Sequence, residues 1–457
     1  MSENTPAEPL PVVVVGAGPT GLAAAAELLE RGLEPLVLEA GPSAATSVRA
    51  WGHVRLFSAW SELVDPAAAR LLAPTGWQSP DPQRYPTGAE WVELYLQPLA
   101  DALGQRVQYR TTVIGAARRG RDRVVDSGRA EQPLTVHTRA ADGTEERLLA
   151  AAIIDASGTF ATPNPLGSDG LPAVRERALA DRISYAVPDT ADPVTRSRHA
   201  HRRTAVVGSG HSALTALVTL AELAKAEPGT SAVWVLRRGS VGNAFGGGSA
   251  DQLPARGALG ERAKQAVAAG HIEVVQGFRT EAVERDGGRL VLVAADGARI
   301  GNLDEIIGLT GFRPDHSWSS ELRLTLDERL QAPLKLAPLI DPNQHSCGTV
   351  YPHGAAELAH PAEPDVYLVG MKSYGRAPTF LAMTGYEQVR SVVAALAGDH
   401  EAAERVELTL PETGVCGGAG LFDEPEATKS GSGGCCSAPA TQLLTIGSGA
   451  SVPSGGC

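Results

Sequence analysis

The chain opens with a pattern of apolar and polar positions that is typical of a strand–helix–strand unit. Val12 to Val15 form a continuous apolar run, as expected for a parallel strand that is buried on both faces. The segment from Gly21 to Arg31 is rich in Ala and Leu, and it predicts a helix that stops at Gly32. The run "PLVLE", which ends at Glu39, predicts a second strand. These elements together predict a complete βαβ unit.

The same pattern returns between Arg202 and Arg238, in "RRTAVVGSGHSALTALVTLAELAKAEPGTSAVWVLRR". Each unit is followed by short runs that are typical of β-strands. They lie at 106–118, 123–128 and 134–140 after the first unit, and at 271–278, 280–288 and 289–297 after the second. An amphipathic helix is predicted over 87–104, and residues 163–202 are expected to be a connecting segment. A further strand in "DVYLVGMKSYG" and a helix in "GYEQVRSVVAALAGD" complete the pattern.

Composition and charge exclude several classes of partner. The formal net charge of −12 argues against a nucleic acid or an anionic membrane as partner. No apolar run is long enough to span a bilayer, and "MSENTPAEPLP" lacks the pattern of a secretory signal. Cysteine is sparse, which is typical of a reducing compartment. We therefore expect a cytoplasmic protein that acts on a small molecule.

The glycines of the first unit are spaced for binding a dinucleotide. Gly16, Gly18 and Gly21 form G-x-G-x-x-G directly after a predicted strand and at the start of a predicted helix. The first glycine permits a tight turn, the second lets a diphosphate approach the backbone, and the third lets helix and strand pack closely. The N-terminus of the helix then stabilises the phosphate charge. Glu39 stands where a carboxylate accepts hydrogen bonds from ribose hydroxyls.

The second unit has a different ending, which predicts a different ligand. Gly208, Gly210 and Ala213 form G-x-G-x-x-A, and the strand that follows ends in Arg237 and Arg238 instead of an acid. Arginines at this place suit the 2′-phosphate of NADPH, whereas an acid suits a free ribose hydroxyl. The alternative is that the two arginines are simply a solvated strand end.

Two dinucleotide units in one chain indicate an α/β flavoprotein with two Rossmann-like domains, each carrying a β-meander. We expect an FAD-binding domain in two parts, an inserted NADPH-binding domain with its connecting segment, and a flexible cysteine-containing tail. The expected boundaries are 1–165 and 315–410 for FAD, 166–314 for NADPH, and 411–457 for the tail. Stretches such as "SGSGG" and "GSGAS" mark the tail.

Several segments resemble those of the FAD- and NADPH-dependent monooxygenases related to flavin-containing monooxygenases and thioredoxin reductases. The similarity covers about residues 11–400 and includes "IIDASGTFATPNP", "EIIGLTGFRPD" and "VYLVGMKSYG". More narrowly, "SCGTVYPHG" and "VGMKSYGRAPTFLAMTGYEQVRS" resemble segments of flavoprotein monooxygenases from arsenic-resistance operons. The aromatic, glycine and histidine signature that precedes the second glycine motif in flavin-containing monooxygenases is not legible here.

The resemblance implies that NADPH reduces FAD and that oxygen then forms a flavin C4a-peroxide. A soft nucleophile, for the narrower family a trivalent organoarsenical, would be oxidised by it. No acid–base residue is assigned to that scheme, and no metal cofactor is expected. Three alternatives stay open: a reductase that uses the tail cysteines as a shuttle, a monooxygenase of organic amines or sulfides, and a metalloid-binding protein without catalysis. The chain contains no C-x-x-C or C-x-x-x-x-C, which disfavours a disulfide reductase.

The resemblance also implies further cofactor contacts. Trp51 and His53 lie where relatives contact the flavin, although core packing explains them equally well. Val113 corresponds to a residue whose backbone meets the adenine. Many relatives carry Gly-Asp after the last FAD strand, where this chain has Gly370 and Met371.

Three polar side chains follow that strand, namely Lys372, Tyr374 and Arg376. They are expected either to line the active cavity or to lie in a solvated loop. His211, directly after Gly210 of the second motif, is expected to be only a polar residue at the start of a helix.

All five cysteines lie in the last quarter of the chain: Cys347, Cys416, Cys435, Cys436 and Cys457. Cys435 and Cys436 are adjacent within "KSGSGGCCSAPA". Thiolates are soft ligands that prefer thiophilic ions. We expect Cys435 and Cys436, with Cys347 or Cys457, to capture a trivalent metalloid substrate. The alternatives are a tail without a role and a redox relay.

Overall fold

The computed structural model describes residues 9–239, 241–246, 251, 253–344, 353–377 and 381–408 of the 457-residue chain. Within these ranges the first glycine unit lies in a parallel sheet with the strand order β16-β7-β1-β2-β3. Its strands are β16 (Val366–Leu368), β7 (Ala152–Asp155), β1 (Val12–Val15), β2 (Pro35–Leu38) and β3 (Val107–Gln108).

The second glycine unit lies in another parallel sheet, which confirms the predicted two-dinucleotide architecture. Among the described residues its strand order is β11-β10-β9-β15-β8. Its strands are β11 (Ile272–Val275), β10 (Ser231–Val235), β9 (Arg203–Val207), β15 (Glu305–Gly308) and β8 (Ile183–Ser184).

An antiparallel meander follows each unit. The first consists of β4 (Thr111–Arg118), β5 (Leu134–Ala140) and β6 (Glu145–Ala150). The second consists of β12 (Thr280–Asp286), β13 (Arg289–Ala294) and β14 (Arg299–Leu303).

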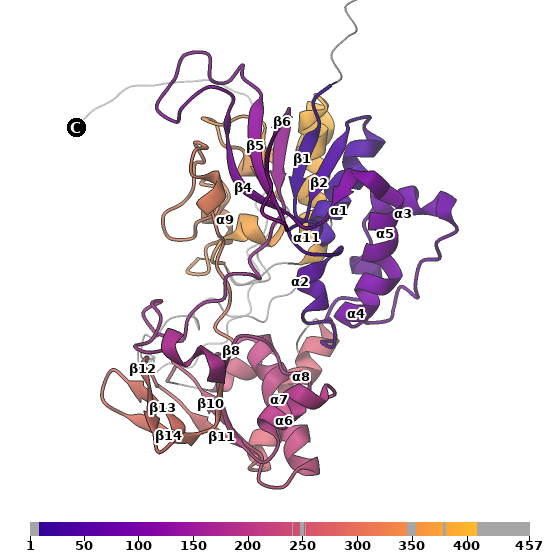
Figure 1. Cartoon of the computed structure of the whole chain (residues 1–457). Helices are drawn as coiled ribbons and strands as arrows, with labels where there is room; N and C mark the ends of the chain where they lie inside the picture. Colours follow the sequence, from indigo (N-terminus) through magenta and orange to yellow (C-terminus); the bar gives the residue numbers. More distant parts are fainter. Residues whose placement is uncertain are drawn as a thin grey trace, which may run out of the picture. The chain divides into compact units, whose positions relative to one another are not determined.

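The longer helices cover the parallel sheets. Figure 1 shows α1 and α11 side by side near β1 and β2, and α7 beside α8. The α-helices are α1 (Pro19–Glu30), α2 (Thr46–Arg49), α3 (Pro66–Leu72), α4 (Gly88–Trp91), α5 (Gln97–Leu103), α6 (Pro193–His199), α7 (His211–Ala226), α8 (Pro254–Ala268), α9 (Ala337–Ile340), α10 (Ala355–Leu358), α11 (Ala382–Leu396) and α12 (His400–Glu404). The short helical turns are η1 (Trp60–Glu62), η2 (Ala73–Thr75), η3 (Val92–Leu96), η4 (Gly104–Arg106), η5 (Arg177–Arg182), η6 (Gly242–Phe245), η8 (Ser317–Ser319) and η9 (Gly370–Tyr374). No described helix is both long and apolar enough to cross a lipid bilayer.

The apolar run of β1 is explained by burial on both faces of its sheet. Val12 and Val14 pack into the cluster that contains residues of α1 and α11. Val13 and Val15 pack into a separate cluster with Val113 and other residues of the first meander. Because helices cover one face and the meander covers the other, an alternating pattern would place polar side chains in a core.

The chain passes between the two parallel sheets at two segments that pair with each other. Pro163 and Phe312 form an antiparallel bridge. The amide of Asn164 donates to the Gly311 carbonyl at 2.9 Å, and its side chain donates to the Thr310 carbonyl at 2.9 Å. These contacts place the segments "GTFATPNP" and "LTGFRP" side by side.

The structure corrects three predictions of secondary structure. Residues 123–128 are not a strand, because the Asp122 side chain accepts from the Val124 amide at 2.9 Å and closes a turn in which Val124 is 83% exposed. The third strand of that meander is β6. The segment 163–202 is more than a connection, because it supplies β8 to the second sheet and also contains α6.

The predicted helix over 87–104 contains a wider π turn, η3, between α4 and α5. Pro98 has no backbone N–H to donate to the carbonyl four residues earlier. That carbonyl belongs to Leu94, and it accepts a hydrogen bond from the Trp77 indole at 2.7 Å instead. The Trp77 indole thus replaces the backbone donor that Pro98 lacks. This replacement explains why the helix widens here.

Candidate dinucleotide sites

The first glycine turn leaves space where a ligand is needed and none where packing is needed. Gly16 has φ +99°, and a Cβ atom there would lie 2.9 Å from the Ala156 carbonyl oxygen. A Cβ at Gly21 would collide with the Gly16 carbonyl, so the helix packs directly on the turn. By contrast, a Cβ at Gly18 would meet nothing within 4 Å. Gly18 is the N-cap of α1 and makes no side-chain cap, so the helix N-terminus is available to an anion.

Glu39 connects the end of β2 to this turn. Its carboxylate accepts hydrogen bonds from the backbone amides of Ala17 at 2.8 Å and Gly41 at 2.7 Å. Each carboxylate oxygen still has a lone pair that can accept a hydrogen bond from a ribose hydroxyl. The Glu39 carbonyl accepts from the Thr111 amide at 2.9 Å, which places the start of β4 beside it. Val113, two residues further along β4, is buried in the core below.

The second glycine turn repeats the geometry of the first. Gly208 has φ +138°, and a Cβ there would collide with the Leu309 carbonyl. A Cβ at Gly210 would meet nothing within 4 Å, and Gly210 is the N-cap of α7. Ala213 is fully buried, in the place of the third glycine. The Gly208 carbonyl accepts from the Trp234 indole at 2.8 Å, which fixes the turn against β10.

Arg237 and Arg238 follow β10 after one residue, Leu236, at the carboxyl end of the sheet. Arg237 is exposed, and its guanidinium donates to the Ser168 carbonyl at 3.1 Å. Arg238 is half-buried, and its carbonyl accepts from the Gly277 amide at 2.8 Å. The two residues thus lie at the strand end where the sequence predicts them. Their role in binding one remains a prediction.

The aromatic segment after the first unit packs against the starts of two helices, α4 and α7. The Trp51 ring is half-buried against Gly88, where a Cβ would lie 2.7 Å from it, so this ring packs on the start of α4. His53 is exposed. Phe57, which sequence reasoning did not single out, lies 5.5 Å between ring centroids from His211, in an edge-on arrangement. His211 is the first residue of α7, as expected, so Phe57 contacts the start of the second dinucleotide helix.

The last strand of the first sheet ends against the first glycine helix. Gly370 has φ +65°, and a Cβ there would lie 2.8 Å from the Thr20 hydroxyl in the first turn of α1. Its amide donates to the Gln388 side chain at 2.8 Å. Met371, in the place where many relatives have an acid, is half-buried.

Two of the three side chains expected after Met371 are buried and do not lie in a solvated loop. Lys372 is 1% exposed and forms an ion pair with Asp155 at 2.6 Å, and Tyr374 is 2% exposed. Arg376 alone of the three expected residues is exposed, and it donates to the Gln331 side chain at 2.9 Å. A signal for the ion pair was present in the sequence, because "AIIDASG" places an acid at the end of an otherwise apolar strand.

The residues expected to bind a metalloid are Cys347, Cys435, Cys436 and Cys457, and with Cys416 all of them lie outside the described residues. The expected tail, 411–457, lies outside them as well.

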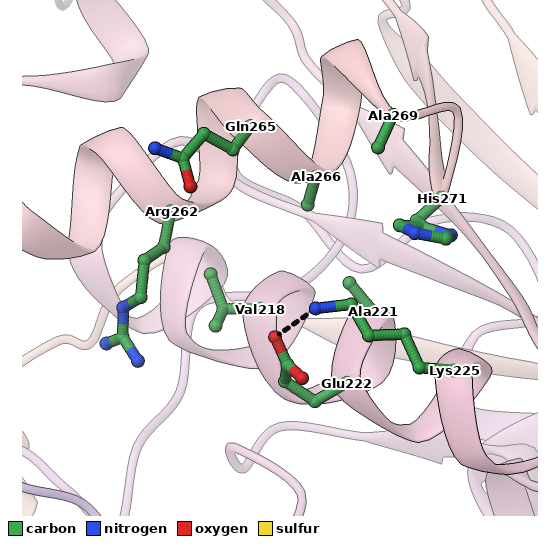
Figure 2. A pocket seen from close by; sticks show the side chains of 9 residues that line it. All are labelled: Val218, Ala221, Glu222, Lys225, Arg262, Gln265, Ala266, Ala269 and His271. Atoms are coloured by element: carbon green, nitrogen blue, oxygen red, sulfur yellow. Dashed lines mark hydrogen bonds and ion pairs between the residues drawn. The ribbon is translucent and has the colours of Figure 1, made fainter.

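A small pocket lies between α7 and α8 (Figure 2), and no residue of either glycine turn lines it. It has a volume of about 150 Å³, and the Lys225 ammonium forms an ion pair with Glu222 at 2.8 Å on its floor. Arg262, Gln265 and His271 complete its polar lining. Its α7 residues start at Val218, near the middle of the helix, and so lie away from Gly210. The pocket is smaller than the clefts of about 300–1,000 Å³ that usually hold small ligands.

Both turns fit a dinucleotide on three counts: an uncapped helix N-terminus, open space at the second glycine, and a polar side chain at the end of the second strand. A model of a known protein family matches residues 13–337, which is well over half of the chain. The chain belongs to the pyridine nucleotide-disulphide oxidoreductase family. FAD and a nicotinamide coenzyme are therefore its cofactors, and it is a flavin-dependent oxidoreductase.

Solved structures of the same fold include enzymes with different activities. The bacillithiol disulfide reductase of Bacillus cereus shares 18% identity and a TM-score of 0.63, with 86% of this chain and 99% of that chain covered. The FAD-bound cadaverine monooxygenase of Erwinia amylovora shares 13% identity and a TM-score of 0.60, with 88% and 98% covered. The ornithine hydroxylase of Pseudomonas aeruginosa shares 18% identity and a TM-score of 0.55, with 86% and 99% covered. No curated protein sequence matches this chain. At these identities the solved structures establish the fold alone.

Within this family the residues of the first turn would hold FAD. The α1 N-terminus and the open side of Gly18 would bind the diphosphate, and Glu39 would bind the adenosine ribose. When bound, FAD supplies the acceptor for a hydride. The protein's own part is to bind, orient and shield.

Proposed function

We propose that the protein is an NADPH-dependent FAD monooxygenase that transfers one oxygen atom to a soft nucleophile, a trivalent organoarsenical or related metalloid. The observation that carries the choice of monooxygenase is the absence of cysteine from residues 1–346. A reductase that relays electrons through a cysteine pair needs both thiols beside the flavin. The two glycine turns and the whole of β1 to β15 lie in the cysteine-free part. Oxygen chemistry at the flavin needs no such pair.

Arg237 and Arg238 support NADPH as the preferred coenzyme. They follow β10, which neighbours β9 and its glycine turn, and the described part of this strand end offers no carboxylate of its own. A guanidinium binds a phosphate through charge-assisted hydrogen bonds, whereas an acid would repel it. On this proposal residues 166–314 form the NADPH domain, and residues 1–165 with 315–410 form the FAD domain.

The positions of the cysteines support the choice of substrate. Five soft ligands gathered after residue 346, two of them adjacent, suit a trivalent arsenical or antimonial that is bound by sulfur. In the net reaction one atom of dioxygen is transferred to arsenic, which loses two electrons. The other atom leaves as water. The remaining two electrons come from NADPH, and one proton comes from solvent. A reducing, cytoplasmic location would keep the thiols available.

The deciding experiment measures NADPH oxidation and oxygen uptake by the purified, FAD-loaded protein. The substrates are a trivalent organoarsenical, antimonite, an amine, a thioether and a low-molecular-weight disulfide. The proposal expects the arsenical to stimulate NADPH and oxygen consumption equally, with one pentavalent product per NADPH in separation with arsenic-specific detection.

Other outcomes would contradict the proposal in recognisable ways. NADPH oxidation that needs a disulfide and no oxygen would identify a reductase. Stimulation by the amine or the thioether alone would identify a monooxygenase of organic substrates. An arsenical that binds but never stimulates NADPH oxidation would identify a metalloid-binding protein.

A further inference from the structure

A buried ion pair lies beneath the first glycine turn, and none of the roles described above requires it. The Lys372 ammonium lies 2.6 Å from the Asp155 carboxylate, and both side chains are 1% exposed. The same ammonium donates to the Ser157 hydroxyl at 3.0 Å. The Trp318 ring covers it, with the ring centroid 5.3 Å from the nitrogen.

Stability alone does not explain this pair. Both charges must leave water, and their mutual attraction only partly offsets that cost. Replacing a buried ion pair by apolar side chains of similar volume is often neutral or stabilising for a fold. A buried pair therefore suggests a constraint on local geometry, and its surroundings show which geometry is constrained.

The pair lies where three strands end beside the FAD turn. Asp155 is the last residue of β7 and pairs with Val15, the residue before Gly16. Lys372 follows β16 and stands two residues after Gly370, which contacts Thr20 in α1. The pair thus joins the ends of β7 and β16 at the edge where β1 enters the glycine turn.

Ser157 connects the pair to the turn itself. Its amide and its hydroxyl both donate to the Asp155 carboxylate, at 3.1 and 2.6 Å. A Cβ atom at Gly16 would lie only 3.1 Å from the Ser157 Cα, so the two backbones touch. Any displacement of Ser157 would therefore reach the glycine turn through direct contact.

We propose that Asp155 and Lys372 are positioning residues for FAD: the pair fixes Ser157 against Gly16 and so holds the diphosphate-binding turn in its binding-competent shape. A site held by buried hydrogen bonds binds its ligand more tightly, because less conformational freedom is lost on binding. The inference concerns retention of the cofactor and is independent of which substrate is oxidised.

The test separates cofactor binding from folding. In the Asp155→Leu/Lys372→Met variant both charges and all three hydrogen bonds between the pair and Ser157 are removed with little change in volume. We expect an apoprotein whose melting temperature stays close to that of the wild type, but whose Kd for FAD rises by about tenfold or more. Titration of FAD fluorescence gives the Kd. The Asp155→Asn/Lys372→Met variant keeps an acceptor for Ser157. Its Kd for FAD should therefore lie between that of the wild type and that of the Asp155→Leu/Lys372→Met variant.

A Kd of the Leu/Met variant within about threefold of the wild-type value would overturn the proposal. If that variant does not fold, Ser157→Ala decides, because it leaves the ion pair in place and removes only the hydroxyl link. We then expect the Kd to rise by about threefold or more, and an unchanged Kd overturns the proposal.

Glu363→Gln is the matched control for general destabilisation. Glu363 is also a buried partner of cationic side chains, Arg118 and Arg129, but it precedes β16 and lies at the opposite end of that strand from Lys372. This variant should lower the melting temperature and leave the Kd for FAD unchanged. An equal rise of the Kd in the control would mean that destabilisation explains the effect, and this would also overturn the proposal.

Discussion

Gly18 and Gly210 occupy equivalent positions: each is the N-cap of the helix that follows a glycine turn, and neither has a neighbouring atom within 4 Å of its Cβ position. Their backbone is also ordinary, with φ of −79° and −84°. A side chain at either glycine therefore costs the fold little and enters only the space that a diphosphate would occupy.

Valine at these two positions should separate the two cofactors. Gly18→Val is expected to yield folded protein that is largely free of FAD. Gly210→Val should keep its flavin but lose most of its affinity for the nicotinamide coenzyme. Flavin content from the visible spectrum and anaerobic flavin reduction measure the two effects. Full flavin content in Gly18→Val would contradict the assignment of the first turn.

Gly21→Val serves as the contrasting substitution. Its side chain would collide with the Gly16 carbonyl, so the turn and α1 can no longer pack. We expect loss of soluble folded protein with this variant, whatever cofactor is present. Circular dichroism of the three glycine variants distinguishes a steric block of the ligand from a failure of packing.

The preference for NADPH should depend on the pair of arginines after β10. In Arg237→Ala/Arg238→Ala the loss of charge-assisted hydrogen bonds should cost about 1.5–3 kcal/mol of NADPH binding, or roughly 10- to 100-fold in affinity. NADH, which lacks the 2′-phosphate, should be little affected. Anaerobic flavin reduction by each coenzyme provides the comparison, and the exposed Arg299→Ala in β14 is the control. Equal losses for NADPH and NADH would rule out a phosphate contact.

The sequence was sufficient for elements whose signal is local and insufficient for groups that depend on distant partners. The glycine spacing and the apolar run of β1 predicted both dinucleotide turns, because each is formed within about 30 residues. The acid at the end of β7 was visible in the sequence, but its pairing with Lys372 was not predictable, since the Lys372 ammonium meets Asp155 and Ser157 from a distant part of the chain, with Ser157 215 residues away. The strand prediction at 123–128 was wrong. Two adjacent valines are typical of a strand, but the Asp122 side chain accepts from a nearby backbone amide and closes a turn there.

Stability should fall as the pH rises from about 4.5 to about 7, because of Glu27 in α1. Burial, followed by the nearby Asp65 and Glu30 carboxylates, raises the pKa of Glu27 from 4.5 to about 7. The folded state then holds a proton that the unfolded state releases, so stability is lost between about pH 4.5 and 7, by up to about 3 kcal/mol. Glu27→Gln should reduce this slope and be more stable than the wild type at pH 8. Melting temperatures at pH 5.5 and 8 test this, and parallel pH profiles would contradict it.

Glu363 should be among the most sensitive positions for folding. Its carboxylate is fully buried and accepts from Arg118 at 2.7 Å, from Arg129 at 2.8 Å and from the Arg323 amide at 2.8 Å. Removing the charge leaves two buried guanidinium groups uncompensated, which typically costs about 3–5 kcal/mol. Glu363→Ala should therefore lower the melting temperature by many degrees. Glu145→Ala, at an exposed ion pair with Arg139, should change it little.

Removal of the cysteine tail tests the capture hypothesis. Truncation after Leu410 should preserve FAD binding and flavin reduction, because both glycine turns lie upstream. It should weaken oxidation of a trivalent arsenical at low concentration and less so at saturation, because a tethered ligand pair raises the local concentration to about millimolar. Cys347→Ser in the full chain is the complementary variant. An unchanged kcat/KM for the truncated enzyme would mean that the tail has no part in capture.

The pairing of the segments "GTFATPNP" and "LTGFRP" has a consequence for how such a chain can evolve. Because Pro163 and Phe312 are bridged, the chain between them leaves the part that contains the first glycine turn, and returns to it, at a single place. A unit with adjacent ends can be exchanged for a homologous one without moving the ends of its host. Recombination at these two segments would graft a new coenzyme specificity onto an unaltered flavin site, and a chimaera built across the same junctions should inherit its nicotinamide preference from the donor alone.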